Sequence, residues 1–269
     1  MNDSHSAPKG ARTPWQVTRS VWHAMFMREA ISRTMSDRMG WFWMIFEPVA
    51  FIAIMAGIRS FISSDELIAN AEFIPWMIVG LMGFFLVREG MQRAIGAIEA
   101  NSSLFTYRQV LPVDPVFVRN FLESLLRSFV FLIFILGGFL LGMNLFPDNA
   151  VKAMVAWMSL WCLGLGLGLT VSVAASLVPE VGRVVRMTSL PLMIISGVIF
   201  PLNQLPHWML EYLMLNPIPH GLETLRLSFF ENYKTIHGTS MTYFWLITLS
   251  LNALGLLMHL RFVDRLKAK

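Results

Sequence analysis

Long apolar runs separated by short charged segments make up most of this chain. A transmembrane helix needs about 20 mainly apolar residues to cross a hydrocarbon core of about 30 Å. Runs of roughly that length predict spans over residues 40–61, 73–93, 116–143, 151–178 and 241–260. A further run, 187–200, is short for a span, and we expect its helix to start in the charged segment before it. The pattern predicts an all-α integral membrane protein with six transmembrane helices.

The residues before the first span, 1–39, predict a cytosolic tail followed by a helix. Residues 13–16 are Thr-Pro-Trp-Gln, in which threonine can cap the helix, proline suits its first position and glutamine can complete a capping box. Val17, Val21 and Met25 then share one stripe. This amphipathic pattern favours an interface helix that lies along the membrane surface, although an ordinary surface helix would also show it. Because the stretch lacks a signal-peptide pattern, we expect the N-terminus in the cytosol.

Residues 201–238 fit neither a loop nor a span. The segment is apolar and aromatic, yet prolines interrupt it at positions 201, 206, 217 and 219. Proline lacks the backbone donor and breaks the interior of a helix. We therefore expect two short re-entrant helices on the periplasmic side, between the fifth and sixth spans, covered by other helices. They would belong to a single transmembrane domain, residues 40–269.

Composition and charge support a membrane protein and predict its orientation. The chain is 55% hydrophobic and 14% charged, whereas a soluble domain carries roughly 25% charged residues. With the N-terminus inside, the inner segments hold 16 of the 21 lysine and arginine residues and the outer segments hold 3. The positive-inside rule therefore favours both termini in the cytoplasm. The net charge of +4 does not indicate nucleic-acid binding, because no basic and aromatic module for it appears.

The sequence carries no signature of an enzyme. It has no phosphate-binding GxxxxGK[ST] loop, no HExxH or GxSxG motif, and one cysteine. Glycines at 164, 166 and 168 predict close helix packing within a span, and Gly138 and Gly142 repeat the pattern. His220 follows a proline, which favours a helix-end histidine over a metal ligand. We expect no cofactor in this chain, so energy for transport must come from a partner or an ion.

Charges within or beside the spans are functional candidates, since each costs about 2.5–3.5 kcal/mol to insert at the centre of a span. Three acid–base pairs are spaced four residues apart with the acid first, which favours pairing within one helix. The pairs are Glu29 with Arg33, Glu89 with Arg93, and Glu123 with Arg127. This leaves Arg88 without a local partner, on the same stripe as Phe84. Arg88 would meet either an anionic sugar or phosphate, or a lipid headgroup.

The ends of the first span offer a similar choice. Arg59 lies at the outer end and can bind an anion or extend to the interface. Trp41 and Trp43 lie at the inner end, where tryptophan commonly anchors a helix, although its ring can also stack on a sugar. Pro48 follows Glu47 inside the span and predicts a bend, because the proline leaves one backbone carbonyl without a donor.

Three segments carry a family resemblance. Residues 40–48 match the pattern G-x-x-W-x-x-x-E-P. Residues 99–123 contain Glu-Ala-Asn at 99–101, a tyrosine at 107 and Val-Leu-Pro-Val-Asp at 110–114. Residues 196–226 contain Ser-Gly-Val-Ile-Phe-Pro-Leu, then Gln-Leu-Pro and Asn-Pro. Together, from Arg28 onward, they resemble the opening, first cytoplasmic loop and re-entrant segment of type-2 ABC exporter permeases for capsule polysaccharide, of the KpsM/Wzm type.

The resemblance implies a transport subunit that is not itself an enzyme. Two copies would form a homodimer around a conduit, and ABC ATPase subunits carrying ATP and magnesium would dock below. The substrate would be a lipid-linked anionic polysaccharide, handed on to periplasmic co-polymerase and outer-membrane export proteins. The chain would then lie in the bacterial inner membrane as a multi-pass protein.

The resemblance also implies roles for particular residues. A substrate conduit would be lined by Trp41, Trp43, Phe84, Arg88 and Arg59. The coupling loop, about 96–119, would present to the ATPase Glu99, Ala100, Asn101 and Tyr107. The re-entrant helices, about 201–238, would form a periplasmic gate that includes Pro201, Pro206, Trp208 and Pro217.

Two other functions remain as alternatives. A drug or lipid exporter of the same fold would have a mainly apolar conduit, in which loss of Arg88 would matter little. A membrane-embedded glycosyl or lipid transferase would need converging acids or histidines near one interface and would act without an ATPase. A passive channel is disfavoured, because no ring of carboxylates and no carbonyl motif appears in the sequence.

Overall fold

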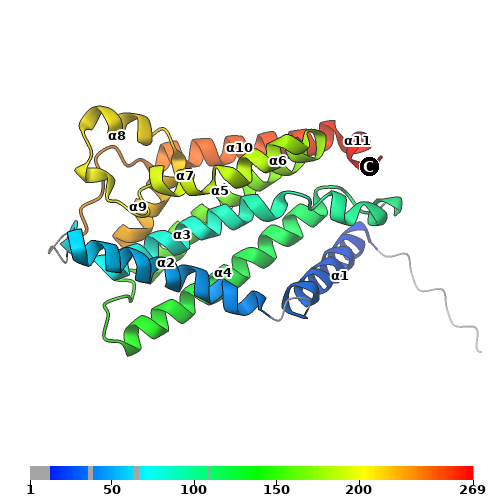
Figure 1. Cartoon of the computed structure of the whole chain (residues 1–269). Helices are drawn as coiled ribbons and strands as arrows, with labels where there is room; N and C mark the ends of the chain where they lie inside the picture. The colour runs from blue at the N-terminus through cyan, green and yellow to red at the C-terminus, as the bar shows by residue number, and fades with distance from the viewer. Residues whose placement is uncertain (1–12, 36–38, 63–66, 108, 269) are drawn as a thin grey trace, which may run out of the picture.

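The computed structural model describes residues 13–35, 39–62, 67–107 and 109–268, and most of them are helical (Figure 1). The α-helices are α1 Pro14–Met35, α2 Gly40–Ile62, α3 Phe73–Ala94, α4 Asp114–Leu140, α5 Ala150–Leu177, α6 Pro179–Met187, α7 Ser189–Ile195, α8 His207–Leu213, α9 Pro217–Phe229, α10 Met241–Arg261 and α11 Val263–Lys267. The 3-10 helices are η1 Glu99–Thr106 and η2 Leu202–Gln204. The strands β1 Leu67–Ile68 and β2 Ala71–Glu72 form one antiparallel hairpin, a small departure from the all-α prediction.

Five helices are long and apolar enough to cross a membrane, namely α2, α3, α4, α5 and α10. Each coincides with a predicted span, which confirms the class of helical membrane protein. The run 187–200, predicted as another span, instead holds α7 and the turn after it, while α6 covers the charged segment before it. Pro191 accounts for the break at Thr188, because it has no N–H to bond back into α6 and is tolerated in the first turn of a new helix. The sixth span therefore stays a prediction.

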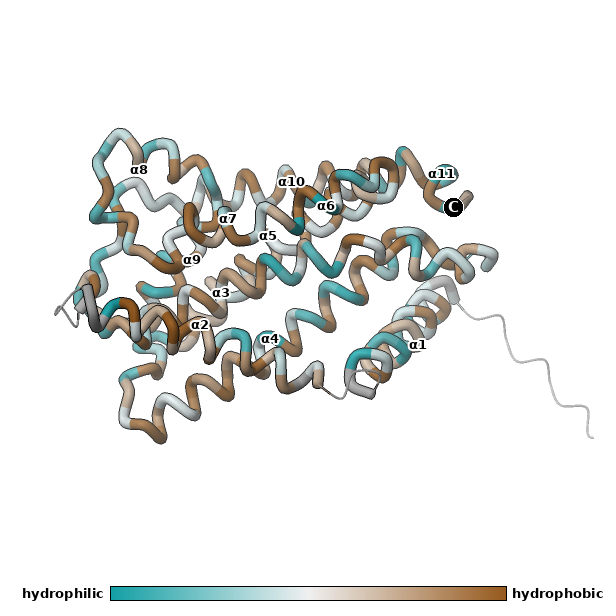
Figure 2. Tube along the Cα trace, in the orientation of Figure 1, coloured by the Kyte–Doolittle hydropathy of each residue, from teal (hydrophilic) through white to brown (hydrophobic). Residues whose placement is uncertain are grey.

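The centre of the bundle is α3. This helix packs against α4, α5 and α9, and most of its residues are buried. In contrast, α2 and α10 bury only 17% of the residues in their most apolar stretches. Figure 2 shows that hydrophilic residues interrupt α3 and α4 in the half of the bundle nearer α1. These polar positions within apolar helices are where the candidate site is found.

The glycines of α5 allow three helices to approach closely. A Cβ on Gly164 would lie 3.2 Å from the Cα of Val87 in α3, and one on Gly168 would lie 2.7 Å from the carbonyl oxygen of Gly90. Gly166 points the other way, toward Asn252 of α10. The prediction of a small-residue packing surface at 164–168 is therefore confirmed.

The second glycine pair does not pack helices together. A Cβ on Gly138 would meet only Leu145, which follows α4 in the same chain. Gly142 has a φ of +74°, a left-handed conformation that glycine adopts without steric cost, and it lies just past the end of α4. The prediction that this pair repeats the packing pattern is wrong; Gly142 belongs to the helix end.

The two ends of the bundle differ in what they carry. The start of α1, the segment η1 and the C-terminal helix α11 lie together at one end (Figure 1). The hairpin and α8 lie at the other end (Figure 1). The predicted helix start is confirmed, because the Thr13 N–H donates to Gln16 Oε1 at 3.1 Å and the Gln16 N–H donates to Thr13 Oγ1 at 3.3 Å.

A buried polar network holds α9 inside the bundle. Arg226 pairs with Glu223 at 2.9 Å, donates to the Gly197 carbonyl at 3.0 Å and stacks 3.6 Å from the ring centroid of Trp76 in α3. The Tyr233 hydroxyl accepts from Trp76 at 3.0 Å and donates to Glu223. Burial raises the pKa of Tyr233 above its ordinary value, so the hydroxyl keeps the proton that it donates. The network joins α3, α9 and the turn after α7.

Candidate functional site

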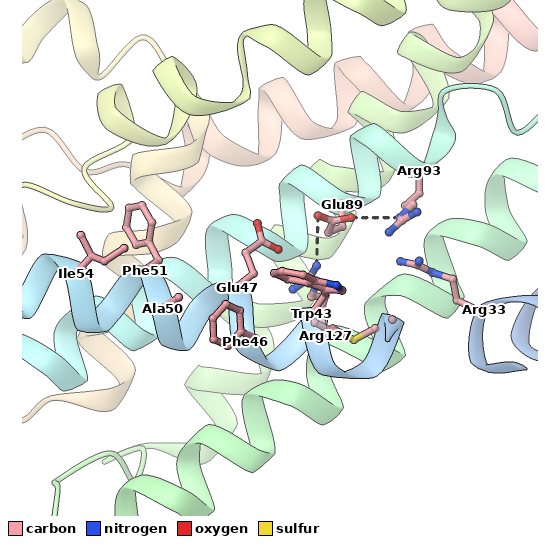
Figure 3. Close-up of a pocket in the computed structure, with 12 residues that line it drawn as sticks. Arg33, Trp43, Phe46, Glu47, Ala50, Phe51, Ile54, Glu89, Arg93 and Arg127 are labelled. Atoms are coloured by element: carbon pink, nitrogen blue, oxygen red, sulfur yellow. Dashed lines mark hydrogen bonds and ion pairs between the residues drawn. The ribbon is translucent and has the colours of Figure 1, made fainter. Parts of the chain in front are cut away.

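A chain of ion pairs joins α1, α2, α3 and α4 between otherwise apolar helices. Seven residues, hereafter the charged cluster, form it: Arg33, Glu47, Arg88, Glu89, Arg93, Glu123 and Arg127. Glu89 of α3 is its centre, with Arg93 at 3.3 Å and Arg127 of α4 at 3.3 Å (Figure 3). Arg88 lies 2.7 Å from the same carboxylate. Glu123 of α4 pairs with Arg33 of α1 and with Arg93, and Glu47 of α2 pairs with Arg88.

Most of these pairs link different helices rather than successive turns of one helix. Glu89 and Arg93 do pair within α3, as predicted. Arg33 instead pairs with Glu123 at 2.8 Å, and Glu29 pairs with Arg119 at 2.9 Å. Both predictions of pairing within α1 and within α4 are therefore wrong. The reason is that α1 packs along α4, so carboxylates and guanidinium groups on the facing sides meet across the interface.

Arg88 has two carboxylate partners, so the expectation that it lacks a local partner is also wrong. Its Nη2 lies 2.8 Å from Glu47 Oε1 on α2 and 2.7 Å from Glu89 Oε1. Its guanidinium lies 4.1 Å from the ring centroid of Phe85. The predicted neighbour Phe84 is 0% exposed within the core. Phe84 thus offers no surface to a substrate in this chain and is not part of the site.

A cavity of about 510 Å³ lies between α2 and the charged residues of α3 and α4 (Figure 3). We call it the α2 cavity, and its lining residues are Arg33, Gly40, Trp43, Met44, Phe46, Glu47, Ala50, Phe51, Ile54, Glu89, Arg93 and Arg127. One wall, from α2, is mainly apolar and aromatic. The facing wall is charged. The cavity is therefore amphipathic, which suits a molecule with an anionic group and an apolar part.

The structure brings together some of the predicted conduit residues and separates others. Trp43 is exposed and lines the α2 cavity, and Arg88 lies beside it through its bond to Glu47. Arg59 lies near the opposite end of α2, where its guanidinium is 4.5 Å from the ring centroid of Phe73. Trp41 belongs to α2, but its side chain lies outside the described part of the structure.

Three arginines that line the cavity were not among the predicted conduit residues, namely Arg33, Arg93 and Arg127. Each follows an acid by four positions, and this spacing predicted pairing within one helix. The sequence did show several arginines within or beside apolar runs, and this could have marked them as a group. They belong to three different helices, α1, α3 and α4. Sequence alone does not show that those helices face one another.

The predicted coupling residues divide into exposed and buried members. Glu99 and Ala100 are exposed in η1, and Tyr107 just after it is 66% exposed. Asn101 is 1% exposed; its side-chain oxygen accepts from Arg28 of α1 and its amide donates to the Ala97 carbonyl at 2.7 Å. Asn101 therefore fixes η1 against α1, whereas the other three are available to a partner.

The predicted gate residues lie around α8 and α9. Pro206 precedes α8, on which Trp208 is exposed, and Pro217 is the first residue of α9. Pro201 is buried before η2. The short helices coincide with the predicted re-entrant pieces, and α9 packs between α3, α5 and α10.

His220 has a structural role in α9. Its Nδ1 accepts from the Ser240 N–H at 3.0 Å, and its Nε2 faces the Met214 carbonyl at 2.8 Å, so Nε2 is the protonated nitrogen. Both ring nitrogens are thus engaged, as expected for a helix-end histidine. Within the described ranges, no group of three or more histidine, cysteine or acidic residues could hold a metal ion.

Comparison with known proteins identifies the family. The model of the ABC-2 type transporter family matches residues 20–230. The chain is 32% identical over 249 residues to the polysialic acid transport protein KpsM of Escherichia coli, covering 93% of this chain and 96% of the relative. It is 27% identical over 246 residues to the capsule polysaccharide export inner-membrane protein CtrC of Neisseria meningitidis, covering 91% and 92%. It is 28% identical over 238 residues to the corresponding protein BexB of Haemophilus influenzae, covering 88% and 89%. This chain therefore belongs to the ABC-2 type transporter family.

Proposed function

We propose that this chain is the membrane-spanning subunit of an ATP-driven exporter of lipid-linked, anionic capsular polysaccharide. The similarity over almost the full length to proteins named for polysialic acid and capsule polysaccharide carries the proposal. Sialic acid is a carboxylated sugar, so a conduit for its polymer needs cationic groups. The charged cluster places arginines at the α2 cavity. This supports a polyanion as the transported substrate, in preference to an uncharged drug or lipid.

The assembly that we propose is a homodimer with ABC ATPase subunits in the bacterial inner membrane. The ATPase would bind ATP and magnesium, and it would dock at the end that carries η1, α11 and the start of α1. That end would be cytoplasmic, with both termini on the same side. The other end, with α8 and α9, would face periplasmic co-polymerase and outer-membrane export proteins.

We propose that transport couples η1 to the helices that frame the α2 cavity. Movement of η1 would act on α1 through Arg28 and Asn101, and α1 is joined to α4 by the ion pair of Arg33 with Glu123. The proposed conduit residues are Trp41, Trp43, Arg88 and Arg59. The proposed gate residues are Pro201, Pro206, Trp208 and Pro217.

Combined replacement of Glu99 and Tyr107 by alanine should abolish association with the ATPase without unfolding the chain. Both side chains are exposed and make no core contact, so their loss removes only surface available to a partner. Copurification of the ATPase and stimulation of ATP hydrolysis in nanodiscs would measure the effect. Tyr212→Ala, an equally exposed tyrosine on α8 at the opposite end, is the matched control and should leave association unchanged.

Deletion of the chain in its native host tests the transport function itself. Surface polysaccharide should disappear, with lipid-linked polymer accumulating in the cytoplasm. Normal surface polysaccharide in the deletion strain would contradict export of this substrate. Transferase activity of the purified chain without any ATPase would instead support the embedded enzyme.

A further inference from the structure

The charge balance of the charged cluster points to a missing anion. Among the residues that the structure describes, the cluster has four guanidinium groups (Arg33, Arg88, Arg93, Arg127) and three carboxylates (Glu47, Glu89, Glu123). The difference of four and three is one positive charge. The neighbouring pair of Glu29 with Arg119 is neutral and does not change this balance. The helices α2, α3 and α4 carry three guanidinium groups and three carboxylates of the cluster, and Arg33 of α1, outside the candidate spans, carries the excess charge. Because Arg33 also lines the α2 cavity, a monoanion bound there would neutralise the cluster.

Among the described arginines of the charged cluster, Arg127 is the one with buried hydrogen-bond donors left over, and Glu123 Oε2 is the buried acceptor left over. The Arg127 side chain is only 4% exposed, and only its Nη2 reaches Glu89, at a long 3.3 Å. Its buried Nε and Nη1 have no hydrogen-bond partner in the described part of the chain. A guanidinium can only donate, and buried donors without acceptors are costly. Phosphate and carboxylate oxygens are the acceptors that match its planar geometry.

The unsatisfied donors belong to a residue that lines the α2 cavity. Figure 3 shows Arg127 extending from α4 toward Glu89, and Trp43 of α2 lines the same cavity. Arg93 lines the same cavity and is partly exposed, so it can contribute a second guanidinium at the edge. The two arginines come from adjacent helices and frame one region of the cavity.

The opposite wall of the cavity favours an apolar chain attached to that anion. Phe46, Phe51 and Ile54 of α2 line this wall, and the side chains of Phe46 and Ile54 are exposed. A volume of about 510 Å³ holds more than an isolated inorganic ion. An anionic headgroup with the first part of an acyl chain therefore fits both walls.

We propose that the α2 cavity binds the phosphodiester headgroup of an anionic lipid, with Arg127 as its principal ligand and Arg93 as a second one. The lipid has two candidate sources with the same headgroup chemistry. One is the lipid anchor of the exported polysaccharide, and this source rests on the proposed function. The other is a phospholipid of the bilayer. Glu47 lines the same cavity and pairs with Arg88. If the lipid carries a second anionic group, that group would replace the Glu47 carboxylate as the partner of Arg88.

Lipid binding by purified full-length protein tests the proposal. The probe is phosphatidylglycerol, which carries one negative charge, and native mass spectrometry measures its retention beside zwitterionic phosphatidylcholine. Arg127→Gln keeps a polar side chain but removes the charge, and we expect phosphatidylglycerol affinity to fall about tenfold or more, the loss of one charge-assisted contact. Retention of phosphatidylcholine should not change.

A second variant keeps the test valid if Arg127→Gln fails to fold. Ala50→Trp fills the cavity from α2 and leaves every charge in place, so it should cause the same loss. Arg183→Gln is the matched control, because Arg183 is an exposed arginine of α6 paired with Glu180 outside this cavity. If both cavity variants fold and retain phosphatidylglycerol with the affinity of the parent, the proposal is overturned.

Surface polysaccharide in cells that carry the same variants separates the two sources. A loss of export in parallel with lipid affinity assigns the cavity to the anchor of the substrate. Normal export despite lost affinity assigns it to a bilayer phospholipid. Failure of the proposed function would appear differently, as normal surface polysaccharide after deletion of the whole chain, and would leave the binding result intact.

Discussion

Replacement of Arg226 by methionine should lower the free energy of unfolding by about 3–5 kcal/mol, the cost of removing one member of a buried ion pair. Arg226 and Glu223 are both 1% exposed, so water cannot solvate the carboxylate that remains. The change also removes the bond to the Gly197 carbonyl and the stacking on Trp76. Because these contacts join α9 to α3 and to the turn after α7, the end that carries α8 should loosen first. Denaturant titration in mixed micelles measures the free energy.

The double variant Glu223→Gln and Arg226→Met provides the control for this prediction. The glutamine oxygen can still accept from Tyr233 and from the Ile236 N–H, and no buried charge is left unpaired. We therefore expect the double variant to recover at least 1 kcal/mol relative to Arg226→Met. A single variant as stable as the parent would show that the buried pair does not hold α9 in place.

Gly168→Ala should destabilise the bundle by about 1–3 kcal/mol, although alanine is the better helix former. Its Cβ would lie 2.7 Å from the carbonyl oxygen of Gly90 and 3.2 Å from the Cβ of Ala94. The nearest atom belongs to the backbone of α3 and cannot rotate away, so α3 and α5 must separate. Since α3 is the central helix, its contacts with α4 and α9 would shift as well.

Gly137→Ala is the matched substitution for Gly168→Ala. Gly137 lies in α4, and a Cβ there would meet nothing within 4 Å. Only the helix propensity changes at this position, which favours alanine by roughly 0.5–1 kcal/mol. Melting temperatures should therefore move in opposite directions for the two variants. Equal effects would mean that the approach of α5 to α3 does not limit stability.

Features that depend on local spacing could be predicted from the amino-acid order. Five spans follow from the length of apolar runs, because crossing a hydrocarbon core requires that length in any fold. The cap at Thr13 and Gln16 joins groups three residues apart, and the prolines of residues 201–238 limit helices wherever they stand. The glycine stripe of α5 indicated close packing, although only the structure identifies α3 and α10 as the neighbours.

Which charges meet depends on the packing of helices that are distant in the sequence. Spacing placed Glu123 beside Arg127, yet α1 contributes Arg33 from 90 positions away in the chain. Arg88 likewise finds Glu47 on α2, and it stacks on Phe85 rather than on Phe84. These partners depend on how each helix is rotated about its axis, which packing across several helices fixes. Local spacing carries no information on that rotation, so the α2 cavity appears only when the helices are assembled.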